Sequence, residues 1–323
     1  MHESGHLAWS EVLFKESSGF ERTAVWTLGI TFFLIFVGGL VRAAGAGLGC
    51  PDWPRCFGLW IPPLTADALP PPYDPAEFNV FKTWLEYVNR LVGVAVGAFI
   101  LVTFVRSIRF FRRNPPVFAG ALAALLLVLF QGWLGGQVVR SGLAGWMITI
   151  HMLVAVLILN VLLFTWFMSV RERLTFPLSS PLQRKLLWGV SLLIGVTLFQ
   201  VVLGSQVREA LSHVMATLPE LARAEWLSEV GRWDPVHRSF SWLVLGASIY
   251  VYRVARTFPL GHALRELAVL NNTAVVLQIL LGVGLAYMGL PPALQIFHLV
   301  VAAFMTSVQF LALLMVTAAP RGR

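Results

Sequence analysis

The sequence predicts an all-α polytopic membrane protein whose eight transmembrane helices form two tandem four-helix bundles related by pseudo-twofold symmetry. Hydrophobic residues make up 57% of the 323 residues and charged residues only 12%, whereas soluble domains carry about 25% charged residues. Eight apolar segments each reach about 20 residues, the length that crosses a bilayer. Three short motifs also recur, in the same order, in both halves of the chain.

Basic residues predict the orientation of the eight spans. Arginine and lysine cluster in the connections 106–113, 171–185 and 253–265 and in the C-terminal tail, which share one side of the membrane if there are eight spans. Cytoplasmic loops carry such an excess, so we expect an integral inner-membrane protein with both termini cytoplasmic. The net charge of +8 therefore does not indicate nucleic-acid binding. The spans are expected near 24–42, 84–105, 117–139, 146–169, 185–207, 234–255, 266–288 and 294–317.

This topology divides the chain into consecutive parts. The predicted parts are a cytoplasmic tail (1–23), an N-terminal half (24–169) with a long outer loop (43–83), a cytoplasmic linker (170–184), a C-terminal half (185–317) and a cytoplasmic tail (318–323).

Internal matches support the two halves. "QGWLGGQVVRSGLAGWMITIH" (131–151) parallels "QILLGVGLAYMGLPPALQIFH" (278–298), with glutamine and histidine 20 positions apart in both. "GGLVR" (38–42) matches "GSQVR" (204–208), and "VNR" (88–90) matches "VHR" (236–238). Four spans restore the starting side, so the halves are expected to be parallel, with sites within or between them.

Histidines mark the candidate sites. The repeat aligns Asn89 with His237 and His151 with His298, each near the outer end of an inward-running span. At 1.5 Å per residue, all four lie about 5–9 Å below the outer boundary. Facing histidines in a helical bundle are a common way to hold haem iron, which makes His237 and His298 candidate ligands. The alternative for each histidine is a satisfied polar contact without a metal.

Two arginines at the outer rim accompany the histidine pair. Arg208 ends the fifth span and Arg238 follows His237 directly. Their guanidinium groups would suit haem propionates, which favour charge-assisted hydrogen bonds.

The N-terminal half departs from this pattern because Asn89 replaces a histidine. A haem held there by His151 would have one weak or open axial position, as oxygen chemistry requires. Glu86 and Arg90 share the helical face of Asn89. Glu86 is therefore a candidate for proton handling, and Arg90 is a candidate contact of that haem. The alternative for Glu86 is an i, i+4 ion pair with Arg90.

The outer loop holds the chain's two cysteines, Cys50 and Cys56, in "CPDWPRC". A cysteine pair in an oxidising exterior can form a disulfide, which would staple this loop. Zinc binding is disfavoured because the loop offers no second Cys or His pair.

Together these motifs resemble the heme A synthase family, the cytochrome oxidase assembly enzymes that convert heme O to heme A. The resemblance extends over nearly all of the chain. "GGLVRAAGAGLGCPDWPRCFG" (38–58) is similar to the family's first outer loop, and "EYVNR" (86–90) stands where the family has Glu-x-x-His-Arg. "QGWLGGQVV" with His151, "VHR" with His237, and "QILLGVGL" with His298 fit the other histidine motifs.

The resemblance implies specific roles. His237 and His298 would ligate a resident heme b, while His151 would ligate the substrate heme O. Glu86 matches the family's essential carboxylate, and Cys50 with Cys56 would be redox-active rather than a simple staple. The reaction would oxidise the C8 methyl group of heme O to a formyl group through hydroxylated intermediates.

The same resemblance implies partners. We expect heme O synthase, cytochrome oxidase assembly proteins, an electron donor and membrane lipid around the chain. The sequence leaves a homo-oligomer open.

Asn89 puts ligation of the substrate in question. This chain could use a pentacoordinate or water-bridged substrate haem, take a ligand from another residue, or bind haem without catalysis. We favour the first, because Glu86 and Arg90 are retained around the change.

Other function classes compete with the synthase. A repeat-built transporter would use Gln131, Gln200 and Gln278 to line a path, but the polar groups lie near one face instead of the midplane. A non-catalytic haem-binding homologue would not need Glu86. A b-type cytochrome would normally show two complete histidine pairs.

Overall fold

The computed structural model describes residues 18–174 and 176–322, and long α-helices dominate this part of the chain. The helices are α1 (Gly19–Ala43), α2 (Val80–Ser107), α3 (Pro115–Arg140), α4 (Gly145–Leu174), α5 (Ser180–Thr217), α6 (Trp233–Ala255), α7 (Ala263–Tyr287) and α8 (Pro292–Ala318). Short 3-10 turns occupy η2 (Ala66–Ala68), η3 (Pro75–Glu77), η4 (Ile108–Phe110) and η5 (Arg223–Val230). The strands β1 (Leu178–Ser179) and β2 (Arg321–Gly322) pair in parallel.

Helix ends follow from local chemistry. Ser18 and Glu21 form a capping box at the start of α1, in which each side chain accepts a hydrogen bond from the other residue's backbone N–H, so two otherwise unpaired donors are satisfied. The α3–α4 and α7–α8 hairpins turn through matching pairs of positive-φ residues, Gly142–Leu143 and Gly289–Leu290. The two long sequence matches therefore share a turn conformation as well as residues.

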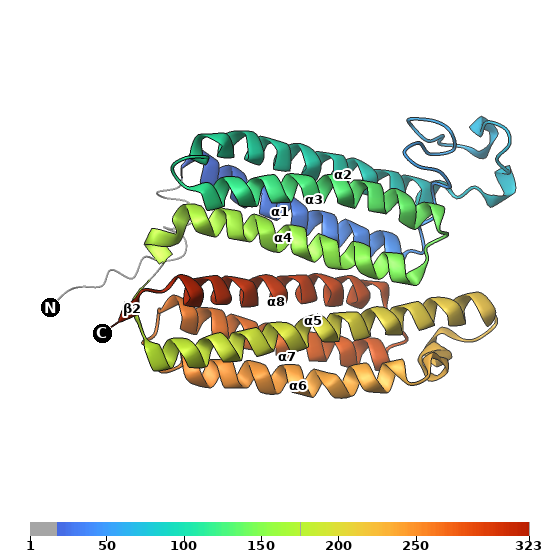
Figure 1. The fold of residues 1–323 in the computed structure, drawn as a ribbon. Helices are drawn as coiled ribbons and strands as arrows, with labels where there is room; N and C mark the ends of the chain where they lie inside the picture. The colour runs from blue at the N-terminus through green and yellow to red at the C-terminus, as the bar shows by residue number, and fades with distance from the viewer. Residues whose placement is uncertain (1–17, 175, 323) are drawn as a thin grey trace.

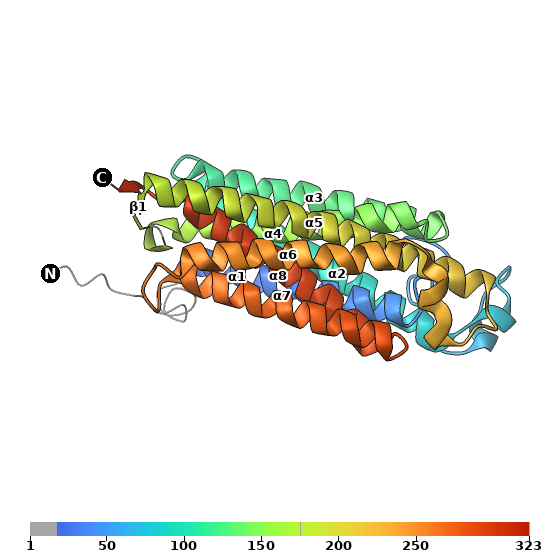
Figure 2. The same ribbon diagram turned by 90° about the horizontal axis from the view of Figure 1, so that it is seen from below.

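The helices form two layers of four (Figure 1). Helices α1–α4 make one layer and α5–α8 the other, with the long connection between α1 and α2 at the same end as the α5–α6 connection. The short strands β1 and β2 lie at the opposite end. Seen from below, all eight helices run roughly parallel or antiparallel to one axis (Figure 2).

Helix α8 joins the two layers. It contacts α1 and α4 of the first layer as well as its neighbours α5 and α7. The largest buried cluster accordingly combines residues of both halves, including Trp166 and Phe167 of α4 with Leu193 of α5 and Met315 of α8. The two halves therefore share one continuous core.

The outer surface is apolar. Trp26, Val94, Trp188 and Trp242 expose 65–74% of their surface, a pattern that suits lipid contact and would be costly in water. Seven of the described helices are long and apolar enough to cross a membrane. The chain is thus an integral membrane protein.

Among the described helices, α6 is the one long helix outside that set of seven. Eight spans were predicted. Asp234, His237 and Arg238 near its start and Arg253 near its end dilute its apolar character. Its 23 residues still match the thickness of a bilayer core.

Two helices extend into segments that were predicted to be connections. Helix α5 continues to Thr217, although the segment after residue 207 was expected to be a connection. Helix α2 begins at Val80, inside the predicted outer loop. Most of the predicted N-terminal tail, residues 1–17, lies outside the described residues.

Candidate functional site

The C-terminal half brings its two predicted histidines together. The ring centroids of His237 on α6 and His298 on α8 are 6.3 Å apart, with ring planes at 62°. Both side chains are half-buried, and both Nδ1 atoms are buried without a hydrogen-bond partner among the described residues. A buried nitrogen without a hydrogen-bond partner is uncommon in folded proteins.

The spacing of this pair fits a metal between the rings. Two metal–nitrogen bonds of about 2 Å each, plus about 1 Å from each ring nitrogen to its centroid, sum to about 6 Å. Among the described residues, no group of three or more His, Cys, Asp or Glu could hold a metal ion. A metal that brings further ligands of its own, as haem iron does, therefore fits better than a bare ion.

Each of the three candidate histidine ligands packs against a glycine of the preceding helix. A Cβ at Gly204 would lie 3.0 Å from Cε1 of His237, and one at Gly282 would lie 3.5 Å from Cε1 of His298. Gly135 lies against His151 in the same way, at 3.4 Å. In these hairpins the imidazole therefore lies against the bare backbone of the glycine.

The N-terminal half places Asn89 on α2 against Gly38 of α1, where a Cβ would lie 3.8 Å from Oδ1. The Oδ1 atom of Asn89 and Nδ1 of His151 are buried, and neither has a hydrogen-bond partner in the part of the chain that the structure describes. Asn89 and His151 therefore occupy the hairpin positions that the repeat predicted, but no hydrogen bond joins them among the described residues.

Glu86 is buried, with 4% of its surface exposed. Its Oε1 accepts a hydrogen bond from Nη2 of Arg90 at 2.5 Å, which forms the expected i, i+4 ion pair. Its Oε2 accepts the backbone N–H of Cys50 at 2.8 Å. The carboxylate therefore links α2 to the cysteine loop.

Arg90 fastens the same loop. Its Nη1 donates to the carbonyl oxygens of Asp52 and Arg55, both at 2.8 Å, and Nη2 donates to the carbonyl of Cys50 at 3.2 Å. The sequence suggested contact with the substrate haem for Arg90. In the structure, both terminal nitrogens hold the loop, and a contact with the substrate haem stays a prediction.

Cys50 and Cys56 form a disulfide. Both are almost fully buried, at 0% and 1% exposure, beside Phe57 and the partly buried Tyr73 and Phe78. The predicted disulfide is therefore confirmed.

The cysteine loop also reaches α3, which sequence reasoning missed. The ring of Trp53 lies so close to Gly136 that a Cβ there would be 2.8 Å from Cδ2. The neighbouring Gly135 faces His151. Trp53 therefore packs on α3 at the residue next to the glycine that contacts His151. The Gly135–Gly136 doublet is the feature of the sequence that could have indicated this contact.

The two rim arginines are already engaged. Arg238 is paired with Asp234 one helical turn earlier. Arg208 donates from Nη2 to the carbonyl of Arg42 at 3.1 Å, while its Nε is buried without a partner in the described part. Arg208 thus ties α5 to the C-terminal end of α1. Asp234 is a further polar residue that the sequence reasoning did not single out.

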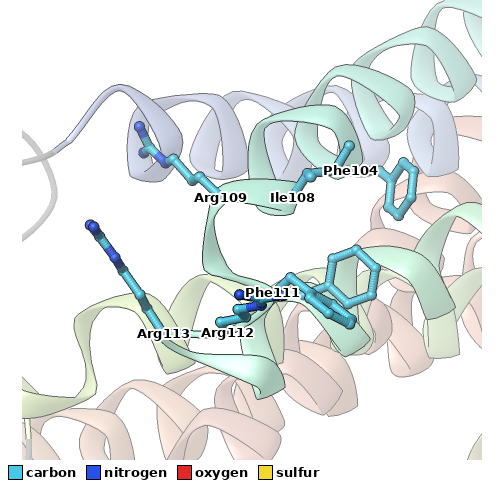
Figure 3. A pocket seen from close by; sticks show the side chains of 7 residues that line it. Phe104, Ile108, Arg109, Phe111, Arg112 and Arg113 are labelled. Atoms are coloured by element: carbon cyan, nitrogen blue, oxygen red, sulfur yellow. The ribbon is translucent and has the colours of Figure 1, made fainter.

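One pocket lies away from these residues (Figure 3). It encloses about 550 Å³ where α2 ends and α3 begins, and three arginines and several apolar side chains line it. Glu86 and Asn89 lie near the other end of α2. This pocket therefore contains none of the predicted site residues. Its lining residues are Phe104, Ile108, Arg109, Phe111, Arg112, Arg113 and Phe118.

Fold and site together define a polytopic helical membrane protein with a paired-histidine site suited to haem. The model of the COX15-CtaA family, described as cytochrome oxidase assembly protein, matches residues 21–310. The chain belongs to this family.

Curated relatives agree with this assignment. The chain is 26% identical to a heme A synthase of Shewanella oneidensis over 304 residues, which cover 84% of this chain and 89% of the relative. It is 26% identical over 318 residues to a heme A synthase of Rhizorhabdus wittichii, with 85% of this chain and 88% of the relative covered. A heme A synthase of Geobacillus kaustophilus is 28% identical over 143 residues, which cover 44% of this chain and 40% of the relative.

Proposed function

We propose that this protein is a heme A synthase, an oxidoreductase that oxidises the C8 methyl group of heme O to a formyl group through hydroxylated intermediates. Family membership and relatives of that name over most of the chain support the activity. The observation that carries it is the His237–His298 pair, whose 6.3 Å spacing suits a haem iron.

In this proposal the C-terminal half holds a resident heme b. His237 of α6 and His298 of α8 would hold it. Arg208, whose Nε is buried, and the partly exposed Arg238 would lie near the haem propionates. When bound between two histidines, such a haem supplies one-electron transfer. Gly204 and Gly282 lie against the two imidazoles.

The N-terminal half binds heme O. His151 would hold it, and Asn89 stands where the repeat has a second histidine. Glu86 would receive or deliver a proton at Oε1 or Oε2, and its bonds to Arg90 and Cys50 hold it in position. Trp53 and the disulfide loop cover this half and restrict water.

The membrane arrangement is part of the proposal. We place α6 as an eighth span, because it packs between α5 and α7 and exposes apolar Trp242 and Leu243. Two tandem bundles related by a pseudo-twofold axis, with both termini cytoplasmic and the histidines towards the outer side, account for the matching hairpin turns. Heme O synthase, cytochrome oxidase assembly proteins and an electron donor are the expected partners, and a homo-oligomer stays open.

The direct test is product analysis. The chain is produced together with a heme O synthase in a host that makes no heme A, and the extracted haems are separated by chromatography. Heme A or its hydroxylated precursor is expected. Glu86→Gln, which keeps a hydrogen-bond acceptor for Cys50 but loses the charge, should lower conversion by about 100-fold or more if the carboxylate moves a proton.

One observation favours a second function, a haem-binding homologue without catalysis. Asn89 is a weak iron ligand, and its Oδ1 lacks a partner among the described residues. Heme b in the purified protein with heme O present but unconverted would support this second function over the synthase.

A further inference from the structure

Three glutamines make the same contact in three different hairpins. Nε2 of Gln131 donates to the main-chain oxygen of His151 at 2.9 Å, and Nε2 of Gln278 donates to that of His298 at 3.0 Å. Nε2 of Gln200 donates to the main-chain oxygen of His237 at 2.9 Å. Each glutamine precedes by four residues the glycine that packs against the same histidine.

The unpaired atoms of these hairpins also correspond. Oε1 of each glutamine is buried and has no hydrogen-bond partner among the described residues, and the same holds for Nδ1 of each histidine. The amide nitrogen is already used by the histidine's carbonyl, so Oε1 remains as a buried acceptor. A histidine that ligates a metal through one nitrogen usually donates its other N–H to such an oxygen.

The fourth hairpin is the exception. Gly38 packs against Asn89, and the residue four positions before Gly38 is Leu34. A leucine offers no amide, and Asn89 has no ring N–H that would need an acceptor. The glutamine is therefore present in the three hairpins that hold a histidine and absent from the one that does not, which a general packing role does not explain.

We propose that Gln131, Gln200 and Gln278 are positioning residues that fix the orientation and raise the basicity of the histidine ligands. This inference rests on the proposed haem sites. The amide nitrogen holds the main chain of the histidine. The amide oxygen is unpaired in the described part of the chain and would accept the Nδ1–H of the ring when the other ring nitrogen ligates iron. The imidazole then presents its other nitrogen to the iron.

The test uses the resident heme b of the purified full-length protein. Gln278→Leu introduces the residue found at position 34, and Gln278→Met is a second variant of similar length should the first fail to fold. Both should weaken binding of added hemin about 10–100-fold. Both should also move the reduction potential to more positive values, because a less basic ligand stabilises ferric iron less, and should change the g-values of the low-spin signal.

Gln131→Leu is the matched control. It removes the same contact at His151, so it should leave the potential and g-values of heme b unchanged. Unaltered hemin affinity, potential and g-values in the Gln278 variants would overturn the positioning role while leaving the haem site intact. Wild-type protein that binds no heme b would overturn both this inference and the proposed site.

Discussion

At the residue scale, each histidine proposed as a haem ligand packs against a glycine of the preceding helix. Gly204 gives the closest approach, since a methyl group there would lie 3.0 Å from Cε1 of His237. Overpacking of this kind costs about 1–3 kcal/mol, and the imidazole is the group that has to move. The contact thus links helix spacing directly to ligand geometry.

We predict that Gly204→Ala lowers the haem-to-protein ratio of the purified protein severalfold. The added methyl group displaces the His237 ring from its position opposite His298. Gly195→Ala on the same helix is the control, because nothing lies within 4 Å of a Cβ there. Equal haem content in both variants would show that the glycine contact does not constrain the ligand.

Asn89 gives a second prediction at this scale. Asn89→His, combined with Leu34→Gln, completes in the first hairpin the set of side chains found in the other three. We expect a second low-spin haem signal per chain by electron paramagnetic resonance when heme O is co-produced, because two histidines would then face that site. Asn89→Ala with Leu34→Gln should add none, and an unchanged spectrum in the histidine variant would contradict the predicted position of the substrate.

The sequence predicted which residues are candidates for the site better than it predicted what those residues contact. The aligned motifs singled out His237 and His298, and their proximity is confirmed. Nothing in the spacing of Arg90 indicated that its guanidinium would hold three carbonyls of a loop 35–40 positions away. Such contacts depend on how a loop folds back, which local periodicity does not encode.

At the scale of elements, the disulfide loop and the start of α2 form one unit. Glu86 and Arg90 bond to it from the helix, and Thr83 Oγ1 donates to the carbonyl of Gly49 at 2.8 Å. Gly49 itself allows this approach, since a Cβ there would lie 2.3 Å from the Lys82 carbonyl oxygen. The loop is thus docked on the helix that carries Asn89.

We predict that Arg90→Ala speeds reduction of the Cys50–Cys56 disulfide by a water-soluble phosphine about tenfold or more. Hydrogen bonds from a charged donor are worth about 1.5–3 kcal/mol each, and 1.4 kcal/mol corresponds to a factor of ten. The rate is followed by alkylation of the released thiols. Arg109→Ala at the opposite end of α2 is the control, and equal rates in the two variants would mean that Arg90 does not brace the loop.

The elements also show where periodicity misleads. The length of α5 was underestimated because the polar residues after Val207 suggest a connection, yet the helix continues to Thr217. Part of the reason is contact with neighbouring connections, because Leu211 and Val214 are buried in a cluster with Val230 and Leu290. Tertiary packing there outweighs the local polarity of the segment.

At the scale of the whole molecule, α6 decides the topology. Three of the four residues that lower its apolar character, Asp234, His237 and Arg238, lie near its start. Polar residues that line an internal site are expected in membrane helices. The proposed haem site therefore accounts for the same feature that sets α6 apart from the other seven helices.

We predict that α6 crosses the membrane. Glu220→Cys before α6 should react with a membrane-impermeant maleimide in intact cells, whereas Leu260→Cys after α6 should react only after lysis. The native cysteines are joined in a disulfide, so they do not react with the maleimide. Labelling of both positions from the same side would contradict an eighth span.

In the proposed function, one half binds the substrate haem and the other half holds the resident haem. Helices α4 and α8, which carry His151 and His298, contact each other, so the substrate site and the resident haem site lie on adjoining helices. One half retains a complete histidine pair, and the other has a single histidine and Asn89. This asymmetry distinguishes the chain from a cytochrome with two equivalent haem sites.

The most direct test is the haem content and low-spin resonance signal of protein purified from a host that makes heme b but no heme O, compared among wild type, His298→Ala and His151→Ala. We expect one low-spin heme b per chain in the wild type and in His151→Ala, and none in His298→Ala. A low-spin haem that survives in His298→Ala, or one that disappears in His151→Ala, would contradict the assignment of the resident haem to the C-terminal half.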